Sequence, residues 1–237
     1  MEIQDIKNNL ERFFMEAATD CPYGLPYRAV YHQALFDTMP DLLMGLYLDS
    51  GYRRNGNIIY NMHCGECRAC VPLRLDPQEF KPNRNQRRVL KKNLDLNVET
   101  APLSFNQENL DLLDKFLTTR FPGRDSSAID YYNGFFLNHI TRTVEFRYRS
   151  GSRLIGSAIV DLSADWLNVV FFYFDPEEEK RSPGTYNILY LTDFCRQKGI
   201  KFIYLGYWIK DVKAMSYKAQ FNPHYLLHGS TWQFING

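Results

Sequence analysis

The chain has 237 residues, of which 45% are hydrophobic and 15% aromatic, so it can bury a substantial core in one large domain or two small ones. Its net charge of +1 excludes a global attraction to nucleic acid, and any such binding requires a local basic patch. The sequence opens without the basic and apolar segments of a signal peptide, and no apolar run approaches the ~20 residues of a membrane span. We therefore expect a cytoplasmic protein with no membrane partner.

The first hundred residues contain two predicted elements. An amphipathic opening helix is predicted by apolar residues at helical spacing, namely Ile3, Ile6, Leu10, Phe13 and Ala17. Residues 53–60 predict a β-hairpin around an Asn-Gly pair. The cysteine cluster and the main basic run both lie before residue 100. We therefore predict an N-terminal domain of residues 1–100 and a second domain of residues 101–237.

The second part of the chain begins with helices and continues with strands. One helix is predicted by the spacing of Leu110, Leu113, Phe116 and Leu117, and a second helix is predicted over residues 130–141. Strands are predicted at three successive segments, 144–149, 153–161 and 166–174. An antiparallel meander that precedes a helical crossover predicts the α+β class.

The last of these strands opens a strand–loop–helix–strand unit. Residues 169–174 predict a buried central strand, residues 185–198 a helix capped by Gly199, and residues 202–209 a second strand with a bulge or close backbone approach at Gly206. The loop before the helix presents free N–H groups and the positive end of the helix dipole, which stabilise an anion or an oxyanion. This order resembles the acyl-CoA-binding core of the acetyltransferase superfamily, although such glycine loops are also ordinary connections in α/β proteins.

The cysteines form the first candidate site. Cys64, Cys67 and Cys70, joined by Cys21 from a distant turn, can supply four thiolates to zinc or to an iron–sulfur cluster, and His63 is a fifth candidate ligand. Three of the five cysteines lie within seven positions, which does not suggest a disulfide framework. The alternative interpretation is a group of buried or merely clustered thiols.

A basic run is the second candidate site. Six basic residues occur within twelve positions that contain no acid, and several share one helical face: Lys81, Arg84, Arg87, Arg88, Lys91 and Lys92. Such a stripe contacts phosphates if a polyanion binds, with steep salt dependence and little base specificity. A solvated helix face is the alternative. Arg53 and Arg54 either extend this patch or are ordinary charges of the hairpin.

A second resemblance covers nearly the whole chain. It depends on Cys-Pro-Tyr at 21–23, on Cys-Gly-Glu-Cys-Arg-Ala-Cys at 64–70, and on further segments at 51–56, 71–74, 80–88, 174–176, 184–186, 204–209 and 215–223. In these segments and their order the chain resembles the short bacterial branch of the aminoacyl-tRNA protein transferases. The resemblance implies transfer of leucine from leucyl-tRNA to proteins that begin with Asp or Glu, which marks them for N-end-rule degradation. It also implies an acetyltransferase-like C-terminal lobe beside a smaller N-terminal lobe that contains the cysteines.

The implied reaction requires little from the protein. An aminoacyl-tRNA is already an activated ester, and an α-amino group with a pKa near ~8 is partly neutral at cellular pH, so no cofactor is required for the chemistry. Orientation of the two reactants and a donor for the oxyanion would accelerate it. We expect the donors near the exposed end of the strand 169–174 and in the loop of Gly184, Thr185 and Tyr186, and we expect Asp175 to assist deprotonation. For Asp175 the alternative is a turn residue before proline.

Selection of an acidic acceptor requires a fixed cation. By their match to the family, Lys218, in the Tyr217-Lys218 pair, and Arg74 are the candidates for this contact. Tyr207 and Trp208 offer faces on which a terminal adenine can stack, and Tyr186 is similarly placed at the start of the helix. Burial in the core is the alternative for these aromatic residues.

The chain departs from the family pattern at two positions. Relatives thought to bind a cluster have a second cysteine at the position of Gly24, and most relatives have leucine where this chain has Pro183, which lacks an N–H donor. Three alternatives to the leucyl reading remain: arginine as the transferred residue, a CoA-dependent N-acetyltransferase, and a cluster-bearing RNA-binding module without activity. We expect a monomer whose partners are aminoacyl-tRNA and proteins or peptides with N-terminal Asp or Glu.

Overall fold

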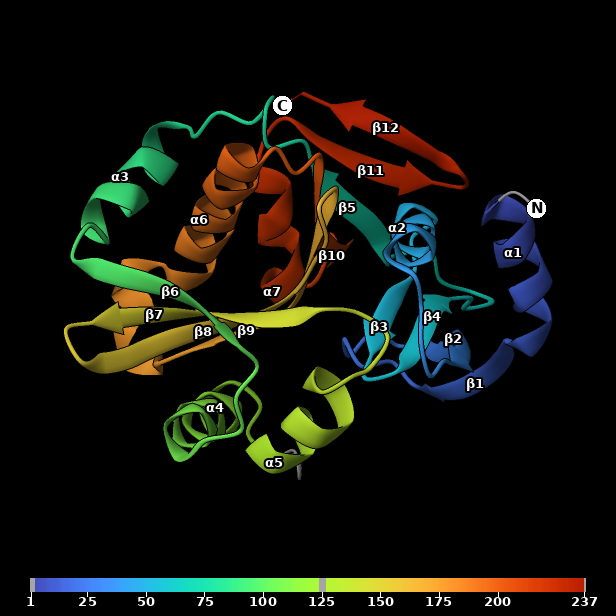
Figure 1. Cartoon of the computed structure of the whole chain (residues 1–237), viewed down its shortest axis with the longest axis horizontal. Helices are drawn as coiled ribbons and strands as arrows, with labels where there is room; N and C mark the ends of the chain where they lie inside the picture. Colours follow the sequence, from blue (N-terminus) through green and yellow to red (C-terminus); the bar gives the residue numbers. More distant parts are fainter. Residues whose placement is uncertain (1–2, 124–126, 237) are drawn as a thin grey trace.

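The computed structural model describes residues 3–123 and 127–236, and it confirms a mixed α+β architecture (Figure 1). Within these residues the strands form two sheets, one with the order β1-β2-β4-β3 and one with the order β12-β11-β5-β10-β9-β8-β7-β6. None of the helices described is long and apolar enough to cross a membrane.

The small sheet and two helices form a lobe at the N-terminal end of the chain (Figure 1). Its elements are α1 (Ile3–Leu10), β1 (Met15–Asp20), β2 (Arg28–Leu35), α2 (Asp41–Asp49), β3 (Arg53–Asn55) and β4 (Ile58–Met62). The hairpin predicted at residues 53–60 is confirmed, and Gly56 adopts a φ of +56° in its turn. The opening helix is shorter than predicted, because residues 15–20 pair with β2 along their whole length and this pairing overrides a weak helical pattern.

The large sheet accounts for the rest of the molecule. Its strands are β5 (Val71–Leu75), β6 (Leu96–Pro102), β7 (Thr143–Ser150), β8 (Arg153–Leu162), β9 (Trp166–Phe174), β10 (Phe202–Trp208), β11 (His224–His228) and β12 (Thr231–Ile235). The helices around it are α3 (Arg84–Lys92), α4 (Gln107–Arg120), α5 (Ala128–Asp130), α6 (Pro183–Lys198) and α7 (Lys213–Ser216). The predicted meander is confirmed as β7-β8-β9. Helices α3 and α6 cover one face of this sheet, and α4 and α5 cover the other (Figure 1).

Two predictions about the organisation of the chain need correction. The predicted division near residue 100 falls inside β6, and β5 lies in the large sheet between β10 and β11, so the break between the lobes precedes β5. The helix predicted over residues 130–141 ends early, as α5 is followed by a π-helical turn, Tyr131–Phe136, and then a loop. In that loop the Asn138 carboxamide accepts hydrogen bonds from the N–H groups of Ile140 and Thr141, which stabilises a turn instead of a helix.

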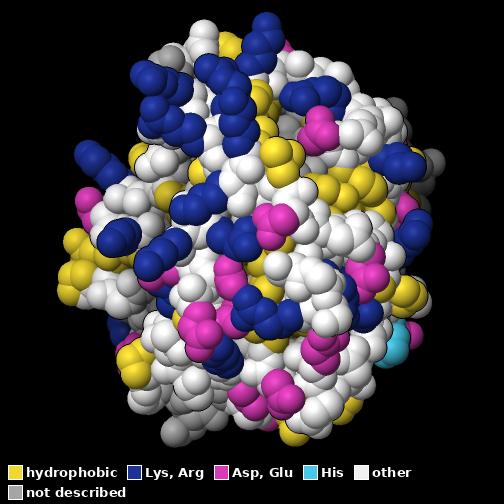
Figure 2. Space-filling model, turned by 90° about the vertical axis from the view of Figure 1, so that its left-hand side faces the viewer, with side chains coloured by type: hydrophobic (Ala, Val, Ile, Leu, Met, Phe, Trp, Pro, Cys, Tyr) yellow, Lys and Arg dark blue, Asp and Glu magenta, His cyan; other side chains and the backbone are white. Residues whose placement is uncertain are grey.

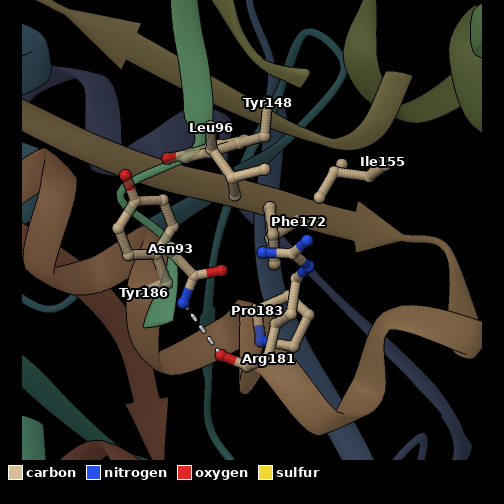
Figure 3. A pocket seen from close by; sticks show the side chains of 9 residues that line it. Asn93, Leu96, Tyr148, Ile155, Phe172, Arg181, Pro183 and Tyr186 are labelled. Atoms are coloured by element: carbon tan, nitrogen blue, oxygen red, sulfur yellow. Dashed lines mark hydrogen bonds between the residues drawn. The ribbon is translucent and has the colours of Figure 1, made fainter. Parts of the chain in front are cut away.

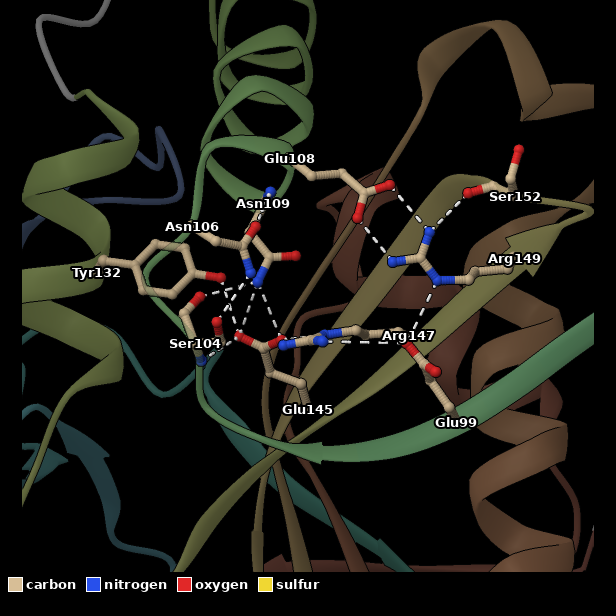
Figure 4. Close-up of polar contacts among 10 residues, drawn as sticks. All are labelled: Glu99, Ser104, Asn106, Glu108, Asn109, Tyr132, Glu145, Arg147, Arg149 and Ser152. Carbon is tan, nitrogen blue, oxygen red and sulfur yellow. Dashed lines mark hydrogen bonds and ion pairs between the residues drawn. The ribbon is translucent and has the colours of Figure 1, made fainter.

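A buried polar network fixes α4 to the sheet (Figure 4). Glu145 of β7 is completely buried and accepts hydrogen bonds from the side chains of Asn109, Tyr132 and Arg147 and from the N–H of Ser104. These donors compensate the carboxylate for the loss of water. The helical layer on this face is therefore held by directed contacts as well as by apolar packing.

Strands β9 and β10 are parallel but pair over only three residues. Residues 202–204 of β10 lie beside residues 166–168 of β9, and beyond them the pairing stops. A bulge follows in β10, where the register against β5 shifts and Gly206 adopts a φ of +83°, as the predicted strand irregularity requires. The two strands therefore diverge and leave backbone groups available to side chains from other elements.

Candidate active site

Two basic side chains lie where β9 and β10 diverge. Arg53 of β3 donates a hydrogen bond from Nη2 to the carbonyl oxygen of Val169 at 3.2 Å, and Lys218 donates from Nζ to the carbonyl oxygen of Tyr207 at 3.0 Å. A Cβ atom built on Gly206 would lie 3.2 Å from Nη2 of Arg53 and 3.5 Å from Nζ of Lys218. The glycine therefore makes room for both cations, and the lobes meet at this point.

The electrostatics of this pair favour an anion. Arg53 is 7% exposed, and this burial lowers the pKa of its guanidinium. Burial, together with the charge of Arg53, lowers the pKa of Lys218 to about 7. In the part of the chain that the structure describes, neither side chain forms an ion pair, and the carboxylate that acts on Arg53, Asp161, is bound by Arg54. Two neighbouring cations without a counter-ion would be stabilised by a carboxylate or phosphate.

Arg54, the next residue along β3, has a different environment. Its guanidinium donates two hydrogen bonds to the carboxylate of Asp161, from Nε at 2.8 Å and from Nη2 at 2.6 Å, and both side chains are completely buried. A third bond reaches the carbonyl oxygen of Phe135 at 2.9 Å. The prediction that Arg54 contacts tRNA is therefore wrong, because the side chain is enclosed and paired.

Arg74 also has its partners within the protein. It forms an ion pair with Asp49, and its guanidinium carbon lies 3.7 Å from the ring centroid of Phe202 and 4.2 Å from that of Trp232. A guanidinium held between two rings and a carboxylate has little capacity left for a second carboxylate. The structure thus disagrees with the expectation that Arg74 binds the acceptor. Among the residues that the structure describes, Lys218 and Arg53 have no carboxylate partner.

The glycine loop lies beside the segment that carries Lys218. Helix α6 begins at Pro183, and the hydroxyl of Tyr217 is 3.7 Å from the position that a Cβ on Gly184 would occupy. The N–H of Tyr186 already donates to the carbonyl of Ser182 at 3.0 Å, and proline has no N–H. In the first turn this leaves the N–H groups of Gly184 and Thr185 without an intrahelical acceptor. The predicted anion-binding turn therefore offers fewer N–H donors than expected.

A shallow pocket lies at the same end of α6 (Figure 3). Its lining residues are Asn93, Leu96, Tyr148, Ile155, Gly156, Phe172, Arg181, Pro183 and Tyr186. The carboxamide of Asn93, just past α3, donates to the carbonyl oxygen of Arg181 at 3.0 Å. Its aromatic floor offers a face to a planar group, whereas the Arg181 guanidinium at its edge is already paired with Asp95 and Glu178.

The other aromatic candidates differ in accessibility. Tyr207 is 2% exposed, and its hydroxyl lies 3.3 Å from the carboxamide oxygen of Asn61, so its ring offers no open face for stacking. Trp208 and Tyr217 are partly buried and pack against the main core. Tyr186 is buried but lines the pocket, so it is the candidate closest to an accessible surface.

Asp175 caps the 3-10 helix Pro176–Arg181. Its carboxylate accepts a hydrogen bond from the N–H of Glu177 at 3.1 Å and forms ion pairs with Lys115 at 2.7 Å and Arg153 at 2.9 Å. Burial acts to raise the pKa of Asp175, but these partners outweigh it and the pKa is lowered. A carboxylate with a lowered pKa and two cationic partners is a weak base, so the structure contradicts a role in deprotonation and supports a capping role.

The basic run forms an exposed patch. Residues 84–92 are the helix α3, capped by reciprocal hydrogen bonds between Asn83 and Gln86, and all six predicted basic side chains are exposed. Figure 2 shows Lys and Arg side chains gathered over the upper part of one face, at the level of α3. The carboxamide of Gln86 also donates to the carbonyl of Gln220 at 3.1 Å, which joins α3 to the short 3-10 helix that carries Lys218, Tyr217–Gln220. The buried side of α3 is therefore fixed to the segment that carries Lys218.

The cysteines gather on the other side of the pair. Burial raises the pKa of Cys70 to about 12, and the nearby thiols of Cys64, Cys21 and Cys67 raise it further in that order. Backbone N–H groups approach the sulfurs of Cys64 and Cys67 at 3.5 Å. The thiols are therefore neighbours, but among the residues described they are not a set with ligand atoms within 4.8 Å of one another. A tetrahedral zinc site is thus not already formed by these side chains.

Two tyrosines complete this region and were not predicted. Tyr60 lies directly opposite Arg53 in the hairpin, and Tyr23 follows Cys21 and Pro22; both act electrostatically on Arg53 and on Tyr207. Burial raises the pKa of Tyr60 to about 12, so this hydroxyl remains a neutral donor. The Asn-Gly signal could not have placed Tyr60, because the two loop residues are Gly56 and Asn57, and a loop of Asn55 and Gly56 would have put Ile58 opposite Arg53.

Comparison with known proteins covers most of the chain in two segments. The family model described as "Arginine-tRNA-protein transferase, N terminus" matches residues 19–88, and the model described as "Arginine-tRNA-protein transferase, C terminus" matches residues 108–228. The chain belongs to the arginine-tRNA-protein transferase family. An "Aspartate/glutamate leucyltransferase" of Pseudomonas fluorescens is 35% identical over 79% of this chain and 81% of its own length. A protein of the same name from Thiobacillus denitrificans is 34% identical over 94% and 95%.

The two halves of this transferase family meet at the cation pair. The N-terminal family segment supplies Arg53, Tyr60 and the cysteines, and the C-terminal segment supplies Lys218 and the start of α6. Neither segment alone contains both cations. The candidate site is therefore shared between the two segments, and it forms when the lobes of the transferase pack together.

Proposed function

We propose that this protein transfers leucine from leucyl-tRNA to the N-terminal Asp or Glu of acceptor proteins, forming a peptide bond that marks them for degradation. Relatives that are 34–36% identical over most of the chain bear the name aspartate/glutamate leucyltransferase. The observation that carries the proposal is the pair of cations, Arg53 and Lys218, that faces no carboxylate of the described protein. Since charged tRNA is the donor, we place the reaction in the cytoplasm.

The cation pair is suited to the acidic side chain of the acceptor. Arg53 presents a planar fork that matches a carboxylate, and Lys218 adds a point charge from the 3-10 helix Tyr217–Gln220. An incoming carboxylate favours the charged form of Lys218 and thereby offsets the cost of its burial. An uncharged N-terminal side chain would leave both cations desolvated and unpaired, which gives selectivity by penalty as well as by attraction.

The donor would approach over α3. Phosphates of the acceptor stem would contact the exposed residues Lys81, Arg84, Arg87, Arg88, Lys91 and Lys92. The terminal nucleotide would then lie over Tyr186 and Phe172, where the pocket begins at the end of α3. The pocket would have to widen for this, because its present volume holds about one water molecule. Contacts to phosphates carry no sequence information, so identity would depend on the amino acid and on tRNA shape.

The chemical step is an attack of the neutral α-amine on the ester carbonyl. The C–N bond forms, the C–O bond to the terminal ribose breaks, and the proton of the amine leaves with the ribose hydroxyl. The N–H groups of Gly184 and Thr185, which have no acceptor within the helix, are our candidates for stabilising the oxyanion, and Gly184 lies near the hydroxyl of Tyr217. The diverging parallel pair β9 and β10 with α6 between them supports an acetyltransferase-like lobe that is reused for this transfer.

A transfer assay tests this proposal. The purified protein would be given leucyl-tRNA or arginyl-tRNA separately, with peptides that begin with Asp, Glu or Ala. We expect leucine on the Asp and Glu peptides only. Arginine transfer would reassign the donor, and consumption of acetyl-CoA without transfer from either tRNA would refute the aminoacyl-tRNA mechanism.

We propose separately that the four clustered thiols of Cys21, Cys64, Cys67 and Cys70 bind zinc or an iron–sulfur cluster after a local rearrangement. Their mutual influence and the N–H groups directed at two of the sulfurs support this proposal. The reaction above does not require the metal. Metal analysis of anaerobically purified protein tests this proposal. Replacing all four cysteines by serine should abolish the bound metal, and an unchanged metal content in that variant would refute the site.

A further inference from the structure

Three side chains from three strands converge on one face of the small sheet. Glu16 of β1 lies directly opposite His32 of β2 in the antiparallel register. His63 lies one residue past β4, and its N–H donates to the carbonyl of Val30 at 2.8 Å, so it continues the strand. Because Asn61 is opposite His32 and side chains alternate along a strand, His63 projects on the same face as His32.

The ligand atoms of this group are close enough for side-chain rotations, including a turn of the two histidine rings out of their stack, to bring them onto one ion. One ligand atom from each of Glu16, His32 and His63 lies within 4.8 Å of the other two. The carboxylate of Glu16 is 3.8 Å from Nδ1 of His63, and the two imidazole rings stack with centroids 4.4 Å apart and planes 7° from parallel. We propose that these three residues bind a divalent transition-metal ion of the zinc class. Two imidazoles and a carboxylate are borderline donors that suit Zn²⁺, Co²⁺ and Ni²⁺.

The surroundings of His32 hold its ring in place. Phe14 stacks on His32 with ring centroids 4.9 Å apart, and the Glu11 carboxylate lies 3.1 Å from Nε2 of His32. The hydroxyl of Tyr52 donates to the same carboxylate at 3.3 Å. A carboxylate that orients a histidine is the usual support of a metal-binding imidazole. Glu11 therefore acts as the positioning residue of the proposed site.

The site would stabilise the part of the protein that presents Arg53. A metal ion held by Glu16, His32 and His63 would link β1, β2 and the end of β4, and β4 pairs with the strand that carries Arg53. This site is distinct from the cysteine cluster, because its donors are nitrogen and oxygen on a sheet face. Cys64 is the next residue after His63, so the experiment has to separate the two donor sets.

Cobalt titration of the full chain after chelator treatment makes this separation. Co²⁺ bound by nitrogen and oxygen gives weak visible bands, whereas thiolate ligands add intense near-ultraviolet charge transfer. In the variant with serine at Cys64, Cys67 and Cys70 we expect one Co²⁺ with the weak bands, whereas the wild type can show thiolate bands in addition if the cysteines also bind metal. The Glu16→Gln and His32→Gln variants should weaken binding by at least about 10-fold, Glu11→Gln by a similar factor, and the exposed control His228→Gln not at all.

The proposal would be overturned by wild-type affinity in both Glu16→Gln and His32→Gln, by no binding of Co²⁺ at all, or by a spectrum of thiolate ligation alone. The Glu16 side chain is 63% exposed, so its substitution leaves a folded protein and keeps the test decisive if His32→Gln does not fold. Zn²⁺ should also raise the melting temperature of the wild-type protein and not that of Glu16→Gln, because a ligand stabilises only the state that binds it.

Discussion

Arg53 and Arg54 are neighbours on one short strand and lie in opposite kinds of surroundings. Arg54 is enclosed with Asp161 and reaches two further acceptors from the large lobe. Arg53 points to the other side of the strand, bonds to one carbonyl of β9 and lies beside Lys218. Alternation along a strand produces this difference, since successive side chains face opposite ways. A pair of basic residues in the sequence thus divides into one that holds the lobes together and one that faces the site.

The difference also separates two uses of a buried charge. The ion pair of Arg54 and Asp161 is complete, so removing either side chain leaves the other charge buried without a counter-ion. The pair of Arg53 and Lys218 is incomplete, so its partner has to arrive with the substrate. Stability should therefore depend on the first pair and acceptor selection on the second.

Breaking the complete pair should give the largest effect. The Arg54→Met substitution leaves the Asp161 carboxylate buried without its cation, and we expect a loss of about 3–5 kcal/mol in the free energy of unfolding. Arg53→Met is the matched control and should cost less than about 1 kcal/mol, because it removes one hydrogen bond to a neutral carbonyl and a repulsion. Denaturant unfolding measures both. Equal losses of stability in the two variants would contradict the conclusion that Arg54, and not Arg53, holds the lobes together.

Breaking the incomplete pair should lower activity and spare the fold. For Lys218→Met we expect kcat/KM with an Asp-initiated peptide to fall by roughly 30- to 1000-fold, the effect of leaving a buried charge without its partner. The melting temperature and tRNA binding should not fall. Lys213→Met, which removes an exposed lysine from the adjacent helix α7, is the control. A loss of tRNA binding that equals the loss of transfer would instead assign Lys218 to the donor.

The sequence predicted the elements whose patterns are local. The strand–helix–strand unit around α6, the meander β7-β8-β9 and the basic helix α3 follow from periodicity and from Gly and Pro signals, and the structure confirms them. The predicted irregularity at Gly206 was also correct, because glycine in a strand marks a bulge or a close approach.

The errors at the candidate site come from partners that are distant in the sequence. Arg54 meets Asp161, and Arg74 meets Asp49 and two rings, through contacts that no linear motif encodes. Asp175 has the residue type of a base but is paired with Lys115 and Arg153. Lys218 was named from its motif, whereas its closeness to Arg53 depends on how the two lobes pack.

The pH dependence of acceptor binding sharpens the same contrast. Lys218 has a pKa lowered to about 7 by burial and by Arg53, so in the free protein it is charged below that pH and loses its charge above it. A carboxylate binds the charged form, so the dissociation constant of an Asp peptide should rise by up to about tenfold per pH unit above 7. An Asn-initiated peptide corrects for titration of the α-amine. The Lys218→Arg variant should lose this dependence, and its retention would show that another group titrates.

Neutralising α3 should give the smallest effect and should act on the donor alone. Replacing Arg84, Arg88 and Lys91 by Gln removes three exposed charges that form no ion pair among the residues described, so the stability of the fold should stay within about 0.5 kcal/mol. If each charge neutralises one phosphate, the slope of log affinity for tRNA against log salt should become shallower by about two to three. Acceptor binding should not change. The matched control is Lys198→Gln together with Lys201→Gln, two exposed lysines at the opposite end of α6 from the pocket. A slope that shifts equally in both variants would mean that tRNA responds to overall charge. A slope that changes only with α3 would separate phosphate contact on the surface from carboxylate selection by Arg53 and Lys218.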